Sequence, residues 1–294
     1  MFQPQVLRGD PGAICAELEL LKAAARMGVL LDALAHAYRV LGTVHRVDSD
    51  PGGLRERLDE ATSRLTADVC GLTDEQAREQ SLLPGWSRGH VLTHLARNAD
   101  GLRNLLTWAR TGVKTPQYPS VEARNAGIEA GSGRPAAALA EDLRQSAAAF
   151  AAAAAVLPGS AWNATVHGVA GRGHPAWFTL FRRLTEVEIH HVDLRLSYLP
   201  ADWPRQFVTD ELELVTGHFA SRDDVPHCEV EVTGQPGEPP QRFVLGSAQA
   251  GGGTVPVTVG GPGWLVLAWL TGRDDGTALS VDSGGHPPRV PAWV

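Results

Sequence analysis

Apolar residues recur every three or four positions through long stretches of the first two-thirds of the chain. This spacing is typical of amphipathic helices that bury one face. It predicts four substantial helices, at Leu54–Cys70, Ser87–Arg110, Pro135–Leu157 and Trp177–Leu196. Long connections lie between them, including the polar stretch Thr111–Arg134 and the glycine-rich stretch Val166–Pro175. Four helices joined in this way predict a four-helix bundle.

Local signals mark several helix ends. The stretch DSDPGG at 48–53 predicts a break before the first helix. Thr73 is followed by Asp-Glu-Gln, a capping-box pattern that opens a short helical turn. Ser87 is the natural N-cap of the second long helix, because its hydroxyl can accept a hydrogen bond from the first helical turn.

The pattern changes after a proline-containing linker at 199–206. The later residues predict a helix at Asp210–Ala220, a helix at Gly263–Thr271 with Trp264 on its buried side, and strands at Cys228–Thr233, Arg242–Leu245, Val255–Val259 and Ala278–Val281. We therefore expect an α+β chain with a helical bundle at 51–198 and a small α+β domain at 207–294. Residues 1–50, which include a predicted helix at Glu17–Leu41, are expected to be a dispensable extension.

Composition narrows the class of protein. The chain has 294 residues, a net charge of −7 and 20% charged residues, as in an ordinary globular protein. The negative charge argues against nucleic acid as a partner. Cys15, Cys70 and Cys228 form no Cys-x-x-Cys pair, so neither a disulfide framework nor a cysteine zinc knuckle is expected. No signal peptide or membrane-spanning run is apparent, and a reducing cytoplasm fits best.

One pair of residues suggests chemistry. Glu186 and His190 are four residues apart in the last bundle helix, so both side chains can reach one small object. His94, on the core-facing side of the second helix, offers a third ligand, and His90 competes with it. Two imidazoles and a carboxylate are typical of catalytic zinc and also of non-haem iron. The alternatives are a simple surface pair and a buried, hydrogen-bonded histidine.

The motifs LPGWSRGHVLTHLARNAD at 83–100, EVEIHHVDL at 186–194 and AWLTGR at 268–273 resemble those of the mycothiol-dependent maleylpyruvate isomerases, which are DinB-like metalloenzymes. The resemblance begins near Leu54. It implies zinc bound by His94, Glu186 and His190, with Arg273 important for activity. The alternative for Arg273 is a cation at the C-terminal end of a helix.

The implied reaction is the cis–trans isomerisation of maleylpyruvate to fumarylpyruvate, by addition of a zinc-activated mycothiol thiolate, rotation and elimination. The substrate is a dianion, so Arg273, and after it Arg97 or Arg183, are candidates for holding a carboxylate. For the last two, an internal ion pair or a solvated helix face is the alternative. Asp193 is placed to orient a ligand imidazole. Rival functions are a thiol S-transferase acting on another electrophile and a non-enzymatic zinc or carrier protein.

Overall fold

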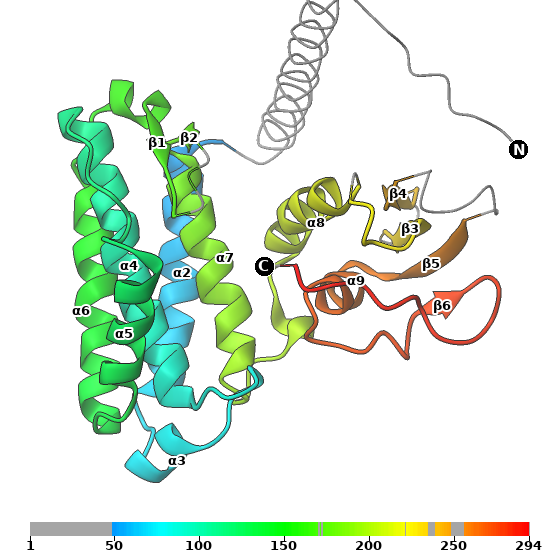
Figure 1. Ribbon diagram of the computed structural model, residues 1–294, viewed down its shortest axis with the longest axis horizontal. Helices are drawn as coiled ribbons and strands as arrows, with labels where there is room; N and C mark the ends of the chain where they lie inside the picture. The colour runs from blue at the N-terminus through cyan, green and yellow to red at the C-terminus, as the bar shows by residue number, and fades with distance from the viewer. Residues whose placement is uncertain are drawn as a thin grey trace, which may run out of the picture. The chain divides into compact units, whose positions relative to one another are not determined.

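A computed structural model of the protein describes residues 49–169, 171, 173–220, 222–234, 239–247 and 256–293 (Figure 1). The helix predicted at Glu17–Leu41 and Cys15 lie outside the described residues. Helices dominate the earlier part of the described chain, and a small mixed sheet follows with further helices, so the predicted α+β class is confirmed.

Four long helices form the bundle: α2 (Pro51–Val69), α4 (Arg88–Thr111), α6 (Ala136–Ala155) and α7 (Phe178–Asp193). Helix α4 packs against α6 and α7, and α2 packs against α7 and α6. The apolar stripes seen in the sequence form the shared core, with Leu54, Leu65, Leu95 and Leu102 fully buried. The four predicted bundle helices are therefore confirmed, with ends shifted by a few residues.

The caps fix where these helices start. Ser87 accepts a hydrogen bond from the His90 backbone N–H, and its own N–H donates to His90 Nδ1. Thr73 forms the expected capping box at α3 (Asp74–Arg78). The break predicted at 48–53 is wrong in its second half, because Asp50 caps the N-terminus of α2 and Pro51 opens that helix. Proline suits the first turn, where its missing N–H costs no hydrogen bond.

The two predicted connections carry structure of their own. Thr111–Arg134 contains α5 (Val121–Ser132), which packs against α4 and is capped by Ser120. A Cβ at Gly89 would lie 2.2 Å from the Ser132 carbonyl oxygen, so glycine permits this close contact. A short 3₁₀ helix, η1 (Gly159–Asn163), precedes the glycine-rich stretch. In that stretch, β1 (Thr165–His167) pairs with β2 (Gly173–Pro175) in an antiparallel hairpin.

The later part of the chain contains η2 (Pro200–Asp202), α8 (Arg205–Phe219), β3 (Cys228–Thr233), β4 (Gln241–Leu245), β5 (Val257–Pro262), α9 (Gly263–Leu270) and β6 (Ser280–Val281). The strand order is β4-β3-β5-β6, with β3 and β5 parallel and the other pairs antiparallel. Trp264 is 36% exposed, so its predicted burial is wrong, whereas Trp269 is buried.

Polar contacts connect the bundle to α8 and to the segment that precedes α8. Arg57 Nη1 on α2 lies 2.8 Å from Asp210 Oδ2 on α8. Trp203 Nε1 donates to the Glu188 carbonyl oxygen on α7 at 3.1 Å. Among the described residues, no helix combines the length and apolar character needed to cross a membrane.

Candidate metal centre

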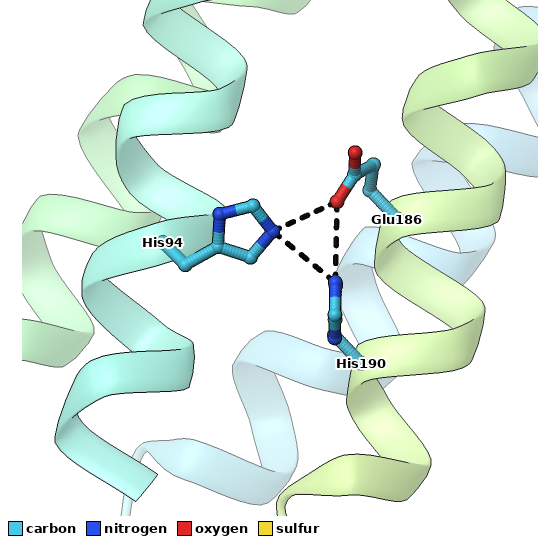
Figure 2. Close-up of side chains that lie close together, drawn as sticks. All are labelled: His94, Glu186 and His190. Atoms are coloured by element: carbon cyan, nitrogen blue, oxygen red, sulfur yellow. Dashed lines mark hydrogen bonds and ion pairs between the residues drawn. The ribbon is translucent and has the colours of Figure 1, made fainter. Parts of the chain in front are cut away.

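Three side chains from two bundle helices meet at one point (Figure 2). His94 comes from α4, and Glu186 and His190 come from successive turns of α7. His94 Nε2 lies 2.9 Å from Glu186 Oε2 and 3.1 Å from His190 Nε2. His190 Nε2 lies 3.3 Å from the same glutamate oxygen. The structure thus brings together the three ligands that the motifs suggested.

Their placement follows from the helices that carry them. The four-residue spacing of Glu186 and His190 puts both on the side of α7 that faces α4. His94 is 3% exposed, and the centroids of the Trp86 and His94 rings lie 5.6 Å apart. The simple surface pair is therefore not an adequate description of these residues.

The donor set fits a divalent metal ion. In a tetrahedral site with zinc bonds of 2.0–2.2 Å, neighbouring donor atoms lie roughly 3.3–3.6 Å apart. The separations of 2.9 and 3.1 Å are slightly shorter and the third, 3.3 Å, falls within this range, so a small outward movement of His94 accommodates the ion. Within the described part of the chain, no other group of three histidine, cysteine or acidic side chains is arranged in this way.

The protonation states of His94 and Glu186 suit a metal ligand set. Burial lowers the pKa of His94, and the attraction of Glu186 only partly offsets this. Burial opposes ionisation of Glu186, but the two histidines outweigh it and hold the pKa of this carboxyl well below its usual range. An ionised carboxylate and a neutral imidazole are the forms that bind metal. Burial opposes protonation of His190, but its hydrogen bonds with Asp193 and Glu186 outweigh this and raise its pKa, so a metal ion has to displace a proton from this imidazole.

A buried ion pair supports His190 from the side away from His94. Its Nδ1 lies 2.8 Å from Asp193 Oδ2, and Asp193 is fully buried. Arg273 donates to both oxygens of Asp193, from Nε at 3.0 Å and from Nη2 at 2.6 Å. Hydrogen bonds from His190 and Arg273 outweigh burial and lower the pKa of Asp193. The carboxylate therefore holds the imidazole with Nε2 directed at the triad.

Arg273 thus reaches the centre through Asp193. Its third nitrogen, Nη1, donates to the carbonyl oxygen of Thr271, which is the C-cap of α9. Arg273 is therefore both near the candidate metal centre and at the C-terminal end of a helix, the two environments that the sequence suggested. Arg273 also lines a pocket that includes Glu186 and His190.

The other arginines named from the sequence are engaged by residues of the bundle. Arg97 Nη2 lies 2.6 Å from Asp142 Oδ1, and the Arg97 side chain is 37% exposed, so this ion pair is partly open to solvent. Arg183 is 1% exposed, and its Nη1 donates to the Leu95 carbonyl oxygen and to Asn98 Oδ1. Burial lowers the pKa of Arg183 to about 10.

His90, His191 and Glu188 make other contacts. His90 Nδ1 accepts a hydrogen bond from the backbone N–H of Ser87 at the start of α4, and His191 Nε2 lies 2.9 Å from Asp68 Oδ2. Glu188 accepts hydrogen bonds from Arg64 and Tyr198. Because they serve these contacts, none of the three joins the metal-binding group.

Sequence reasoning missed Arg124 and Arg182. Arg124 Nη2, on α5, lies 3.1 Å from His94 Nδ1. It escaped notice because its segment was taken for a connection. Arg182 lines the pocket beside Glu186, and it has no hydrogen-bond or ion-pair partner among the described residues. Its position four residues before Glu186 was the signal that would have found it.

The chain is similar to known proteins in both sequence and structure. Residues 58–195 match the family model described as the mycothiol maleylpyruvate isomerase N-terminal domain. A crystal structure of the mycothiol-dependent maleylpyruvate isomerase matches with a TM-score of 0.75 and 29% identity, covering 83% of this chain and 97% of that one. The structure of a histidine-to-alanine variant of such an isomerase matches with a TM-score of 0.72 and 28% identity over the same shares. No curated protein sequence matches significantly.

Proposed function

We propose that the chain is a mycothiol-dependent maleylpyruvate isomerase, because residues 58–195 match the family model of that enzyme's N-terminal domain and the chain is similar to a solved structure of such an isomerase. The observation that supports this most is the convergence of His94, Glu186 and His190 in a chain that matches such an isomerase over 97% of that protein's length. The proposed organisation keeps a bundle at 51–198 and a small α+β domain at 207–294.

The proposed cofactors are zinc and mycothiol. The chemistry that they would supply together is a thiolate at neutral pH, able to add to the cis double bond and to leave after rotation. The chain's part is to hold the metal with two neutral imidazoles and one carboxylate. By counting ligand charges, this set leaves a net charge of about +1, which favours an anionic thiol.

The described cysteines support an external thiol. Cys228 is buried in β3, and burial raises the pKa of its thiol to about 11. Cys70 is exposed at the C-cap of α2 and lies outside the pocket beside the triad. Neither of the two described cysteines is placed to act as the nucleophile, which supports a thiol from a bound molecule, as the family description implies.

The charges around the pocket suit a dianionic substrate. Arg182 and Arg273 line it together with Glu186 and His190. Arg273 acts chiefly by fixing Asp193, and through it His190, since its three guanidinium nitrogens all donate within the protein. Arg182 is free to bind a substrate carboxylate with two parallel hydrogen bonds.

The test is to follow maleylpyruvate with purified zinc-loaded protein, with and without mycothiol. We expect fumarylpyruvate to form only when the thiol is present, and His94→Ala to remove the activity. Conjugation of mycothiol to a generic electrophile, without maleylpyruvate turnover, would instead favour the S-transferase. Bound zinc with neither activity would favour the non-enzymatic alternative. A reducing cytoplasm is the proposed location, because both the free cysteines and the thiol cofactor require it.

A further inference from the structure

A pocket of about 350 Å³ lies between α7 and α8, next to the metal centre. Glu186 and His190 form part of its wall, so a molecule bound there would be close to both ligands. Apolar side chains cover much of the remainder, namely Phe178, Phe181, Ile189 and Leu214. One acidic residue on this wall, Glu211, has no role in the proposed reaction so far.

Glu211 is an unusual carboxyl group for such a place. It belongs to α8 and its side chain is fully buried. Oε2 accepts a hydrogen bond from Thr185 Oγ1 at 2.6 Å. Oε1 has no hydrogen-bond partner among the described residues. A buried polar atom without a partner is destabilising, so a bound molecule that pairs with it gains affinity.

The surroundings of Glu211 favour its neutral form. Burial is the main cause that raises the pKa of this carboxyl to about 8, and the negative charges of Asp210 and Glu186 add to it. The Thr185 hydroxyl opposes the shift without cancelling it. The nearby guanidinium of Arg57 pairs with Asp210, and not with Glu211, so it does not balance a negative charge on Glu211.

In a protonated Glu211 the two oxygens differ. When the Thr185 hydroxyl donates to Oε2, this atom is the carbonyl oxygen of the acid. The acidic O–H is then at Oε1, the atom without a partner. Glu211 therefore offers an unused hydrogen-bond donor at the wall of a pocket that Arg182 and Arg273 also line.

We propose that Glu211 is a substrate-binding residue, which as a neutral carboxylic acid donates a hydrogen bond from Oε1 to an anionic oxygen of the substrate. This inference rests on the proposed function for the identity of that substrate, a small dicarboxylate with a cis double bond. A neutral donor binds such an oxygen without placing another negative charge beside the dianion. An ionised Glu211 would repel the same ligand.

Maleate tests the inference, because it shares the cis-alkene and both carboxylates and needs no turnover. Its dissociation constant would be measured by calorimetry with zinc-loaded wild type, Glu211→Gln and Glu211→Leu. Glutamine keeps a neutral donor, so we expect affinity within about threefold of wild type. Leucine removes the donor, and we expect affinity to fall about 10- to 100-fold, which matches a hydrogen bond to a charged group.

Glu213→Gln is the matched control, because Glu213 is on the same helix but does not line the pocket. It should bind maleate like the wild type. Equal weakening in Glu211→Gln and Glu211→Leu would overturn the proposal, as would unchanged affinity in Glu211→Leu.

An infrared spectrum gives a second readout that needs no ligand. The carbonyl band of a protonated acid should be present in zinc-loaded wild type at pH 7 and missing in Glu211→Gln. Its absence from the wild type would also overturn the proposal. Failure of the protein to isomerise maleylpyruvate would reject the proposed function, while the maleate and infrared results would still report on Glu211.

Discussion

The contact between Asp193 and His190 predicts a specific effect on metal affinity. Asp193 accepts from His190 Nδ1 at 2.8 Å and from two nitrogens of Arg273, and it is fully buried. Partners that orient a ligand imidazole in this way are worth about 10- to 100-fold in metal affinity. This corresponds to roughly 1.4–2.8 kcal/mol. We therefore expect Asp193→Asn to weaken zinc binding by that factor.

The neutral amide cannot satisfy all three donors. If its oxygen takes the place of Oδ2, it still accepts from His190 Nδ1 and Arg273 Nη2, but its NH₂ then faces Arg273 Nε, and two donors oppose each other. The variant should also lose about 3 kcal/mol of stability, because a buried cation is left without its partner. Zinc affinity would be measured by competition with a chromophoric chelator, on protein whose folding has been checked by circular dichroism.

Asp210→Asn is the matched control for this experiment. It removes a buried carboxylate that is paired with an arginine, Arg57, at 2.8 Å, but it has no contact with the triad. It should lower stability and leave zinc affinity unchanged. Wild-type zinc affinity in Asp193→Asn, or the same loss in Asp210→Asn, would refute the reasoning.

Three further predictions follow from the contacts described. Arg182→Gln should raise KM for maleylpyruvate about tenfold with little change in zinc content. Arg110→Gln, at the C-terminal end of α4, should leave KM unchanged. The same KM in Arg182→Gln and Arg110→Gln would contradict this prediction. Deletion of residues 1–48 should leave turnover and solubility intact, provided that Asp50 is kept to cap α2; a large loss of either would show that the extension is needed. Burial lowers the pKa of His174 from 6.5 to about 4, so the stability that the protein has above pH 6.5 should fall by up to about 3 kcal/mol as the pH drops towards 4, at 1.36 kcal/mol per pKa unit. In thermal unfolding, His174→Gln should lose less stability than the wild type over this pH range. An identical loss in the two proteins would refute the assignment.

The bundle could be predicted because each of its helices carries a complete apolar stripe and a recognisable start. Ser87 and Thr73 cap helices at the expected residues, and Leu95 and Leu102 lie in the core as their spacing indicates. Local chemistry alone determines these features.

Helix α5 could not be predicted in the same way. It contains glycines at 127 and 131, which lower helix propensity, and it buries mainly Ile128. Its stability comes from contact with α4, where Gly89 permits a close approach that no local pattern reveals. Arg124, which reaches His94 from this helix, was missed for the same reason.

The candidate site was only partly accessible from sequence. The spacing of Glu186 and His190 suggested a shared target, but His94 is 92 residues away from Glu186, and only the motif resemblance separated it from His90. Glu211 and Arg273 come from the later part of the chain and approach α7 only through the fold. No local pattern connects them with the triad.

The most direct test of the central claim is zinc content and turnover in the same preparations of wild type, His94→Ala, Glu186→Ala and His190→Ala. The wild type should hold about one zinc per chain and form fumarylpyruvate with mycothiol, since the three donors complete one site. Each variant should lose both properties while remaining folded. Full zinc occupancy in a variant would remove that residue from the ligand set, and mycothiol-dependent turnover in a zinc-free variant would contradict the metal centre as the site of reaction.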